Sequence, residues 1–326
     1  MSQAVPMVEI WRGPFLESLH LGQAVICDDS GQIVQAWGDP DAVVLPRSSS
    51  KMLQALPLVR SGAADAASLG TEHLALACAS HAGQTRHTER VTAWLHTLGL
   101  TESDLRCGTH MPYDDEARDD LIRSGQQPCQ CHNNCSGKHT GFLTLTRHLK
   151  AGPEYVEPDH PVQKACLEAF EEATGETSPG FGIDGCSAPN FAASLHGIAR
   201  AMARFAAAPS DSPEARIHRS MRLHPDLVSG TGRACTDLMQ AMNGRVVIKT
   251  GAEGFFVAIL PDQKRGVALK IQDGTTRASE SAMAAILVKL GALDPKHPAA
   301  LKYMSPPITN RAGLITGNLR PSAALS

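Results

Sequence analysis

The stretch that decides the fold is PRSSSKMLQALPL, residues 46–58. Ser48 lies at the start of a predicted helix and Lys51 follows three residues later, so their side chains share one helix face. A lysine amine beside a serine hydroxyl can accept its proton, and the helix dipole favours the anion that develops. Ser-x-x-Lys is also common by chance, as an N-cap serine followed by a surface lysine. Burial of the lysine is favoured by the apolar residues after it: Met52, Leu53 and Leu56.

A second motif, Lys-Thr-Gly at Lys249–Gly251, ends the apolar run of GRVVIKTG, residues 244–251. Taken alone, it could be a strand-end lysine in a turn. Its place on a predicted strand, downstream of a Ser-x-x-Lys that opens a helix, is the arrangement of serine β-lactamases and penicillin-binding proteins. The two motifs together therefore favour that architecture.

Patterns elsewhere in the chain agree with this order. Strands are predicted in MVEIWRG (7–13), in GQAVICDDSGQIVQAWGD (22–39) around a DDSG turn, in three short runs between residues 244 and 273, and in GLITGNLR (313–320). Helical periodicity is found at residues 87–99, 161–175, 189–208 and 276–293. We expect one α+β domain in which residues 1–47 and 244–326 form an antiparallel sheet flanked by helices. A mainly helical region, residues 48–243, is inserted between the two parts of the sheet.

Composition excludes several classes of function. The formal net charge is −3 and there is no run rich in Lys and Arg, so a nucleic-acid partner is not expected. No window of about 18 apolar residues is present, so no membrane span is expected. The first residues, MSQAVPMVEIWRGPF, lack a signal-peptide pattern. Nine cysteines without an export signal are typical of reduced thiols in a cytoplasmic protein.

A third motif, CQCHNNCSGKHTGFL, spans residues 129–143 and is dense in metal-binding side chains. A structural zinc site normally shows two ligand pairs, and here no second pair follows. The nearest later cysteine in a turn-like context is Cys186 in GIDGCSAPNF. Spacing alone leaves packed thiols and imidazoles as an alternative. Cys129 and Cys131 are predicted to be close enough to oxidise together.

Five segments together resemble the Rhizobium etli-type L-asparaginases: RSSSKMLQALPL, CASHAG, CHNNCSGKHTGFL, IDGCSAPNFA and IKTGAEGFF. The resemblance covers roughly residues 5 to 320, nearly the whole chain. It implies a fold of the serine-β-lactamase-like and glutaminase-like type. It also implies hydrolysis of L-asparagine to L-aspartate and ammonia by a homodimer.

Carried over motif by motif, the resemblance assigns two serine–lysine tandems, Ser48 with Lys51 and Ser80 with Lys249. Ser48 is the expected nucleophile because it has both a helix start and a lysine three residues later. Ser80, at the end of the apolar run LALACAS, would otherwise be interpreted as a helix-capping serine.

The resemblance further implies a zinc ion held by three side chains: Cys135, Lys138 and Cys186. Zinc bound by a lysine requires a neutral amine, so we expect zinc affinity to rise with pH. Charge complementarity suggests which residues bind the substrate, an amino acid with one carboxylate and one ammonium group: Arg47, His139 and Asp184.

Three other functions stay open. A glutaminase differs in substrate by one methylene, which a pocket discriminates by only about 1–3 kcal/mol. A β-lactam hydrolase would share the architecture, although no Ser-Asp-Asn element is present. A non-catalytic zinc-binding protein would tolerate the loss of Ser48 and Lys249.

Overall fold

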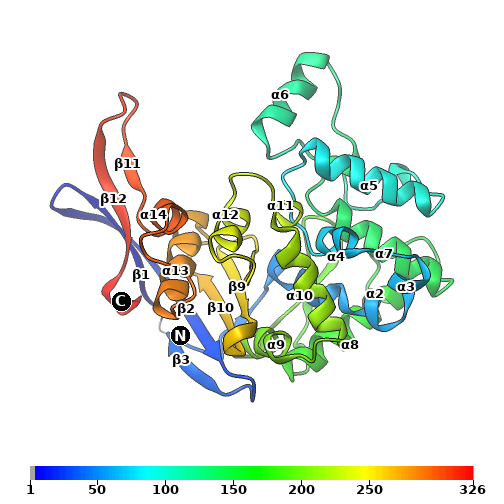
Figure 1. Ribbon diagram of the computed structural model, residues 1–326, viewed down its shortest axis with the longest axis horizontal. Coiled ribbons are helices and arrows are strands. Elements are labelled where there is room, and N and C mark those ends of the chain that lie inside the picture. Colours follow the sequence, from blue (N-terminus) through cyan, green and yellow to red (C-terminus); the bar gives the residue numbers. More distant parts are fainter. Residues whose placement is uncertain (1–3, 326) are drawn as a thin grey trace. The chain divides into compact units, whose positions relative to one another are not determined.

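The computed structural model describes residues 4–325, and its contacts divide the chain into two compact units (Figure 1). The sheet unit consists of the residues up to Ser49, Ala193–Ala207 and the residues from Asp237 onward. The helical unit consists of Ser50–Ala192 and Ala208–Thr236. Each unit has its own core, so each is described by itself.

An eight-stranded sheet built from both ends of the chain dominates the sheet unit. Its strand order is β11-β12-β1-β2-β10-β9-β8, with β3 also paired to β2, and every pairing is antiparallel. Figure 1 shows strands from the two ends of the chain side by side. The strands are β1 Val5–Arg12, β2 Phe15–Cys27, β3 Ile33–Trp37, β8 Val247–Thr250, β9 Phe255–Leu260, β10 Arg265–Ile271, β11 Pro307–Thr309 and β12 Ile315–Pro321. The predicted α+β class with a two-ended antiparallel sheet is confirmed.

The predicted DDSG turn joins β2 to β3. The Asp28 carboxylate accepts hydrogen bonds from the backbone N–H groups of Ser30 (3.0 Å) and Gln32 (3.1 Å). This is the local hydrogen bonding that makes aspartate frequent in turns. The turn therefore forms from its own residues.

Helices cover the centre of the sheet. Every residue of β9 is buried, and successive strand residues point to opposite faces, so both faces are covered there. Helices α9 (Leu195–Ala207) and α13 (Thr276–Lys289) both pack on β9 and β10. At Gly266 of β10, an added Cβ would collide with the backbone of Ala199 and Ala203. Glycine therefore allows α9 to approach the sheet closely. The remaining elements of the unit are β4 Val43–Val44, β7 Ala193–Ser194 and α14 Pro298–Met304, while α12 (Ala234–Ala241) spans the boundary between the units.

The expected helix at residues 189–208 is partly wrong. Its first residues form two short strands, β6 (Pro189–Phe191) and β7, and the helix α9 begins only at Leu195. β6 pairs with β5 (Phe181–Ile183), and β7 pairs with β4. These pairings are tertiary contacts that override the local helical pattern.

The helical unit contains mostly short helices. They are α1 Lys51–Gln54, α2 Leu56–Arg60, α3 Ala63–Ala66, α4 Thr71–Ala77, α5 Thr85–Thr97, α6 Asp115–Ser124, α7 Ser136–His148, α8 Pro161–Thr174, α10 Pro213–Leu223 and α11 Pro225–Val228. The helices predicted at residues 87–99 and 161–175 correspond to α5 and α8. As predicted, α8 ends on a glycine, Gly175, whose φ of 69° is left-handed. No helix among residues 4–325 is long and apolar enough to cross a membrane.

Helix α7 lies inside the helical unit, and its residues Ser136–Thr146 are all buried. Its three threonine hydroxyls are satisfied locally, since they donate to carbonyls four residues earlier at 2.8–2.9 Å. At Gly137 an added Cβ would collide with the Leu76 carbonyl of α4. The close packing of α7 on α4 therefore depends on this glycine.

The helix expected to begin at Ser48 starts later and is divided into two short helices. Arg47–Ser50 form a 3₁₀ turn, α1 ends at Gln54, and α2 begins at Leu56. Pro57 has no N–H to continue the α1 hydrogen bonds, but it is tolerated in the first turn of a new helix. The break therefore follows from the proline.

Candidate active site

Lys51 occupies the first position of α1, and its side chain is completely buried. Its Nζ donates to the Ala79 carbonyl, to Ser80 Oγ at 3.0 Å and to Cys135 Sγ at 3.1 Å. All three partners can accept a hydrogen from the lysine amine. The Ala79 carbonyl can only accept a hydrogen bond, whereas the Ser80 hydroxyl can also donate one. The Lys51–Ser80 contact can therefore carry a proton in either direction.

The segment after α4 holds Ser80 and the next residue, His81, in place. The Ser80 N–H donates to the Val228 carbonyl (2.9 Å), and the His81 N–H donates to the Asn134 carbonyl (3.1 Å). These backbone bonds link the segment to two other parts of the helical unit. Both residues are buried, so the position of the Ser80 hydroxyl is tightly defined.

His81 is a neutral hydrogen-bond donor. Its Nδ1 accepts from the Gly83 N–H (3.2 Å), so Nε2 carries the hydrogen and donates it to Ser136 Oγ (2.9 Å). Ser136 in turn donates to the Cys131 carbonyl (3.0 Å). Burial lowers the pKa of His81 well below its ordinary value. The result is a fixed chain of donors that links Cys131 to the residue beside Ser80.

Cys135, Lys138 and Cys186 converge in the same unit, and all three are buried. Lys138 Nζ donates to Cys186 Sγ at 3.0 Å, and the two cysteine side chains are hydrogen-bonded to each other. That hydrogen bond to Cys186, together with burial, raises the pKa of Cys135 to about 12. It lowers the pKa of Cys186 well below its ordinary value. Burial opposes a charge on Lys138, but the attraction of both sulfurs raises the pKa of its amine. The directions of these shifts favour a charge on Cys186 and on Lys138 and a neutral Cys135.

Cys186 is presented by a turn between β5 and β6. The Asp184 N–H donates to the Ala188 carbonyl and the Ser187 N–H donates to the Asp184 carbonyl, both at 2.9 Å. The half-buried Asp184 contributes negative charge near Lys138 and His139. The structure thus brings four of the predicted residues together with Lys51 and Ser80: Cys135, Lys138, Cys186 and Asp184.

The donor set fits zinc. Two sulfurs and one amine face one another at hydrogen-bonding distance, and zinc binds thiolate and nitrogen ligands in this number when a fourth position stays open. Across residues 4–325, no group of three or more His, Cys, Asp and Glu side chains is arranged to hold a metal. The predicted zinc ligands, Cys135, Lys138 and Cys186, include only two side chains of these types, because the third ligand is a lysine.

His139 is completely buried, and its Nε2 has no hydrogen-bond partner. Tyr155 OH accepts from the Arg106 N–H at 2.7 Å and lies 3.0 Å from His139 Nδ1. We assign Tyr155 as the donor to Nδ1, which gives the hydroxyl hydrogen an acceptor and places the hydrogen of the neutral ring on Nε2. Burial, followed by the charge of Lys138, lowers the pKa of His139 well below its ordinary value. His139 consequently offers one unsatisfied N–H donor, which a bound ligand could use.

Tyr155 and His81 were missed by sequence reasoning. Tyr155 lies in the loop before α8, in the segment PEYVEP, where no motif marks it. His81 is part of CASHAG, and its place directly after Ser80 was the available signal.

Four other predicted or neighbouring residues belong to the sheet unit. Ser48 is half-buried in the 3₁₀ turn, next to Arg47, whose φ of 52° is left-handed and strained for a non-glycine residue. Ser49 Oγ donates to the Lys249 carbonyl (2.9 Å), which ties this turn to β8. Lys249 is buried, and its Nζ donates to the Thr250 carbonyl (2.7 Å). The pairings of Ser48 with Lys51 and of Ser80 with Lys249 stay predictions.

Comparison with protein families shows which family this chain belongs to. The family model of L-asparaginase II matches residues 8–321. The chain belongs to this family. This L-asparaginase II family member is therefore an asparaginase-type amidohydrolase that acts on a small-molecule substrate. No significant match was found among curated proteins.

Two solved structures are similar at low sequence identity. A β-lactamase from Mycobacterium bovis shares 14% identity with a TM-score of 0.46, over 82% of this chain and 94% of that one. An octameric penicillin-binding protein homologue from Pyrococcus abyssi shares 12% identity with a TM-score of 0.35, over 87% of this chain and 76% of that one.

Proposed function

We propose that this protein hydrolyses L-asparagine to L-aspartate and ammonia through a serine–lysine mechanism. The observation that carries the proposal is the buried hydrogen bond between Lys51 Nζ and Ser80 Oγ in a member of the L-asparaginase II family. A buried lysine bonded to a serine hydroxyl is a proton-transfer pair, as catalysis at a side-chain amide requires.

In this proposal Ser48 is the nucleophile, as its position three residues before Lys51 predicts. Its Oγ attacks the side-chain amide carbon while the neutral Lys51 amine accepts the hydroxyl proton. Ser80 and Lys249 then relay this proton from Lys51 to the leaving nitrogen, and ammonia departs. Water hydrolyses the acyl-enzyme by the same path in reverse and restores the Ser48 hydroxyl. The backbone N–H of Ser48 is the proposed donor to the oxyanion.

Substrate recognition is proposed for the three residues named from charge. The unsatisfied Nε2–H of His139 would donate to an oxygen of the substrate, and a buried donor left without a partner costs about 1–3 kcal/mol. Asp184 would attract the α-ammonium group. Arg47 would bind the α-carboxylate as a two-pronged donor.

Zinc is proposed at Cys135, Lys138 and Cys186. When bound there, zinc would supply a positive charge that orients the substrate, and it would join the turn containing Cys186 to helix α7. The protein's own residues make this possible, since Cys186 is already poised as a thiolate. Binding would require the loss of one proton from Cys135 and one from Lys138.

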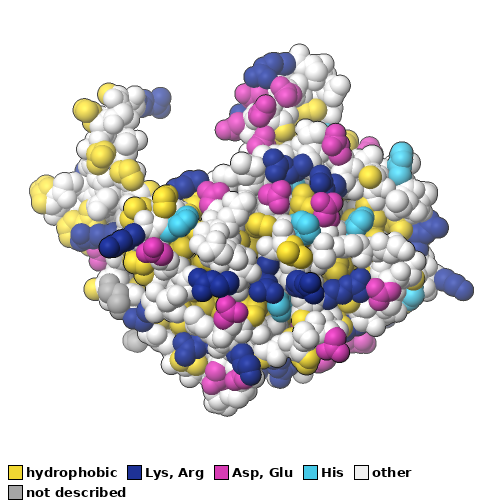
Figure 2. All heavy atoms as spheres, viewed as in Figure 1, with side chains coloured by type: hydrophobic (Ala, Val, Ile, Leu, Met, Phe, Trp, Pro, Cys, Tyr) yellow, Lys and Arg dark blue, Asp and Glu magenta, His cyan; other side chains and the backbone are white. Residues whose placement is uncertain are grey.

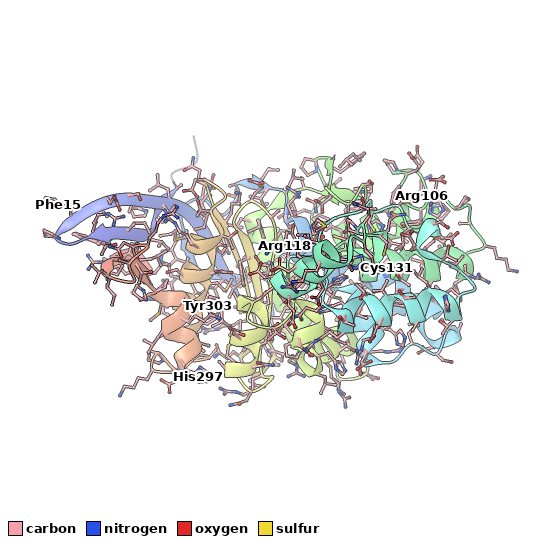
Figure 3. All side chains as sticks on the ribbon, turned by 90° about the horizontal axis from the view of Figure 1, so that it is seen from above. Phe15, Arg106, Arg118, Cys131, His297 and Tyr303 are labelled. Carbon is pink, nitrogen blue, oxygen red and sulfur yellow. The ribbon has the colours of Figure 1, made fainter. Side chains whose placement is uncertain are left out.

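A homodimer and a cytoplasmic location are also proposed. All nine cysteines are free thiols, which is typical of a reducing compartment. Apolar side chains are exposed at the ends of the β1–β2 and β11–β12 hairpins, where Figure 2 shows hydrophobic atoms gathered and Figure 3 shows Phe15 at a hairpin tip. Such patches commonly mark interfaces. Light scattering should report a dimer for the wild type and a monomer when serine replaces both Phe15 (73% exposed) and Ile315 (74% exposed). A wild-type monomer would reject the dimer.

The substrate proposal is tested by measuring ammonia release from L-asparagine and from L-glutamine, with nitrocefin turnover alongside. We expect L-asparagine to be the best substrate. Preference for L-glutamine would make the protein a glutaminase, and nitrocefin turnover without ammonia release would make it a β-lactam hydrolase. Zinc binding without any of these activities would favour a non-catalytic zinc protein.

A further inference from the structure

Cys129 differs from the other cysteines of the chain in its exposure. All nine cysteines lie within residues 4–325; eight of them are buried, and Cys129 is half-exposed. It is the residue that opens the 3₁₀ turn η3 (Gln130–His132). A soluble reagent therefore meets this sulfur before it meets any of the others.

The surroundings of the Cys129 sulfur favour its thiolate. His132 Nδ1 lies 3.2 Å from Cys129 Sγ and 3.0 Å from the Cys129 backbone nitrogen, so the lone pair of the ring nitrogen faces Cys129. The Cys131 side chain is hydrogen-bonded to the same sulfur. Hydrogen bonding of the Cys129 sulfur with Cys131, followed by that with His132, lowers the pKa of Cys129, since His132 Nδ1 is placed to take the thiol proton. Low-pKa, accessible thiolates with a second cysteine beside them are the typical targets of peroxides.

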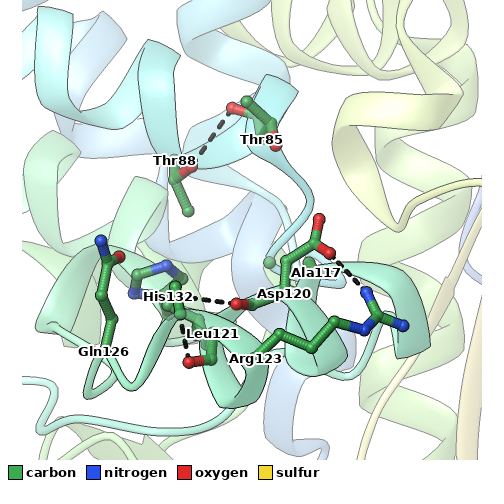
Figure 4. Close-up of a pocket in the computed structure, with 10 residues that line it drawn as sticks. Thr85, Thr88, Ala117, Asp120, Leu121, Arg123, Gln126 and His132 are labelled. Atoms are coloured by element: carbon green, nitrogen blue, oxygen red, sulfur yellow. Dashed lines mark hydrogen bonds and ion pairs between the residues drawn. The ribbon is translucent and has the colours of Figure 1, made fainter.

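The base of this pair is also reachable from solvent. His132 lines an open pocket of about 560 Å³ in the helical unit, together with polar residues of α5 and α6 (Figure 4). Asp120, Arg123 and Gln126 are among its lining residues. A small polar oxidant can therefore approach the imidazole through a hydrated surface.

We propose that Cys129 and Cys131 form a peroxide-sensitive dithiol that closes reversibly to a disulfide. In the first step the Cys129 sulfur attacks hydrogen peroxide. The O–O bond breaks, Cys129 becomes a sulfenic acid, and the released hydroxide takes the thiol proton held by His132 to form water. In the second step the Cys131 sulfur attacks the Cys129 sulfur, the S–O bond breaks, and a second water leaves with the Cys131 proton. One peroxide is thereby reduced to two waters and two thiols are oxidised to one disulfide. A dithiol reductant reverses the change.

Closure of this disulfide would reach the candidate active site through the backbone. The Cys131 carbonyl accepts from Ser136 Oγ, which accepts from His81, the neighbour of Ser80. Gln130, between the two cysteines, is held by Glu102: its N–H donates to Glu102 Oε2 (2.8 Å) and its side-chain amide donates to the Glu102 carbonyl (3.0 Å). Drawing the two sulfurs together around a fixed Gln130 would turn the Cys131 carbonyl away from Ser136. This consequence rests on the proposed function. Misplacement of a catalytic group by about 1 Å can cost about a hundredfold in rate.

The test treats the full-length protein with one equivalent of hydrogen peroxide, alkylates the remaining thiols, and maps disulfides and sulfenic acids by peptide mass spectrometry. We expect a Cys129–Cys131 disulfide as the first product, removed by dithiothreitol. Cys131→Ser should stop at a sulfenic acid on Cys129 that dimedone traps, and Cys129→Ser should prevent both products. Cys235→Ala, at a buried cysteine of α12, is the matched control and should oxidise like the wild type.

First oxidation at Cys135 and Cys186, or no site preference, would overturn the dithiol assignment whether or not the protein is an asparaginase. In parallel, ammonia release from L-asparagine should fall between about tenfold and a hundredfold on oxidation and recover with dithiothreitol. Activity that persists when the disulfide is complete would remove the link to the active site. Cys129→Ser should keep its activity and become resistant to peroxide.

Discussion

The protonation state of the sulfur cluster leads to a quantitative prediction for zinc. The pKa of Cys186 is lowered well below its ordinary value, that of Cys135 is raised to about 12, and that of Lys138 is raised, which favours a thiolate at Cys186, a thiol at Cys135 and an ammonium at Lys138. Zinc requires all three ligands without their protons. Binding therefore releases two protons between about pH 6 and about pH 9, one from Cys135 and one from Lys138.

Each released proton raises the apparent affinity about tenfold per pH unit, so two protons give about a hundredfold per pH unit. Zinc affinity is expected to rise with pH because the raised pKa values of Cys135 and Lys138 keep both groups protonated in the free protein, and a higher pH favours the deprotonated, zinc-bound form. Lys138→Leu removes one of the two protons, and its slope should fall to about tenfold per pH unit, together with a loss of affinity.

Competition titration against a chromophoric zinc chelator of known pH dependence measures these slopes for the wild type and for Lys138→Leu. Isothermal titration in buffers of different ionisation enthalpy counts the released protons independently. A zinc affinity that does not change with pH would refute the assignment of Lys138 as a ligand. An unchanged slope in Lys138→Leu would do the same, since the second proton would then come from elsewhere.

Two further predictions concern single groups in the helical unit. Tyr155→Phe removes the hydroxyl that sets the tautomer of buried His139, so KM for L-asparagine should rise about three- to tenfold with a smaller change in kcat. The control Tyr113→Phe, at an exposed tyrosine, should leave both constants unchanged. If the two variants changed KM and kcat to the same extent, the tautomer argument would be contradicted. Gly137→Ala places a methyl group against the α4 backbone and should lower the free energy of unfolding by about 1–3 kcal/mol in urea titrations. Gly152→Ala, at a glycine with open space around it, should have little effect on that free energy. Equal free energies of unfolding for the two variants would show that α7 and α4 are not closely packed.

Local sequence patterns predicted much of the fold. Apart from β11 and the first part of β2, the strands of the sheet lie in the segments predicted from apolar runs and turn residues. The DDSG turn forms as predicted, and α8 ends at the glycine that predicts its end. The start of α9 was placed too early because β6 and β7 depend on pairing with β5 and β4, which no local pattern encodes. The first helix begins after the 3₁₀ turn that contains Ser48, and its break follows from Pro57, which has no N–H.

Residues of the candidate site could be predicted where they belong to a sequence motif, whereas the contacts between separate motifs could not. Burial of Lys51 followed from its apolar neighbours, and the convergence of Cys135, Lys138 and Cys186 followed from the family resemblance. The hydrogen bond of Lys51 to Ser80 joins residues 29 positions apart in the chain and depends on how α1 and the end of α4 pack. The role of Tyr155 has the same origin, since its partners come from separate segments.

The most direct test of the account is ammonia release from L-asparagine by the wild type, Ser48→Ala, Ser80→Ala and Lys51→Met, with folding of each variant checked by circular dichroism. The account predicts turnover by the wild type and a loss of about a thousandfold or more in Ser48→Ala and Lys51→Met, because nucleophile and base act as one unit. Ser80→Ala should lose less and should still form an acyl-enzyme. Near-wild-type turnover by folded Lys51→Met would contradict the serine–lysine mechanism, and the absence of turnover by the folded wild type would contradict the proposed reaction.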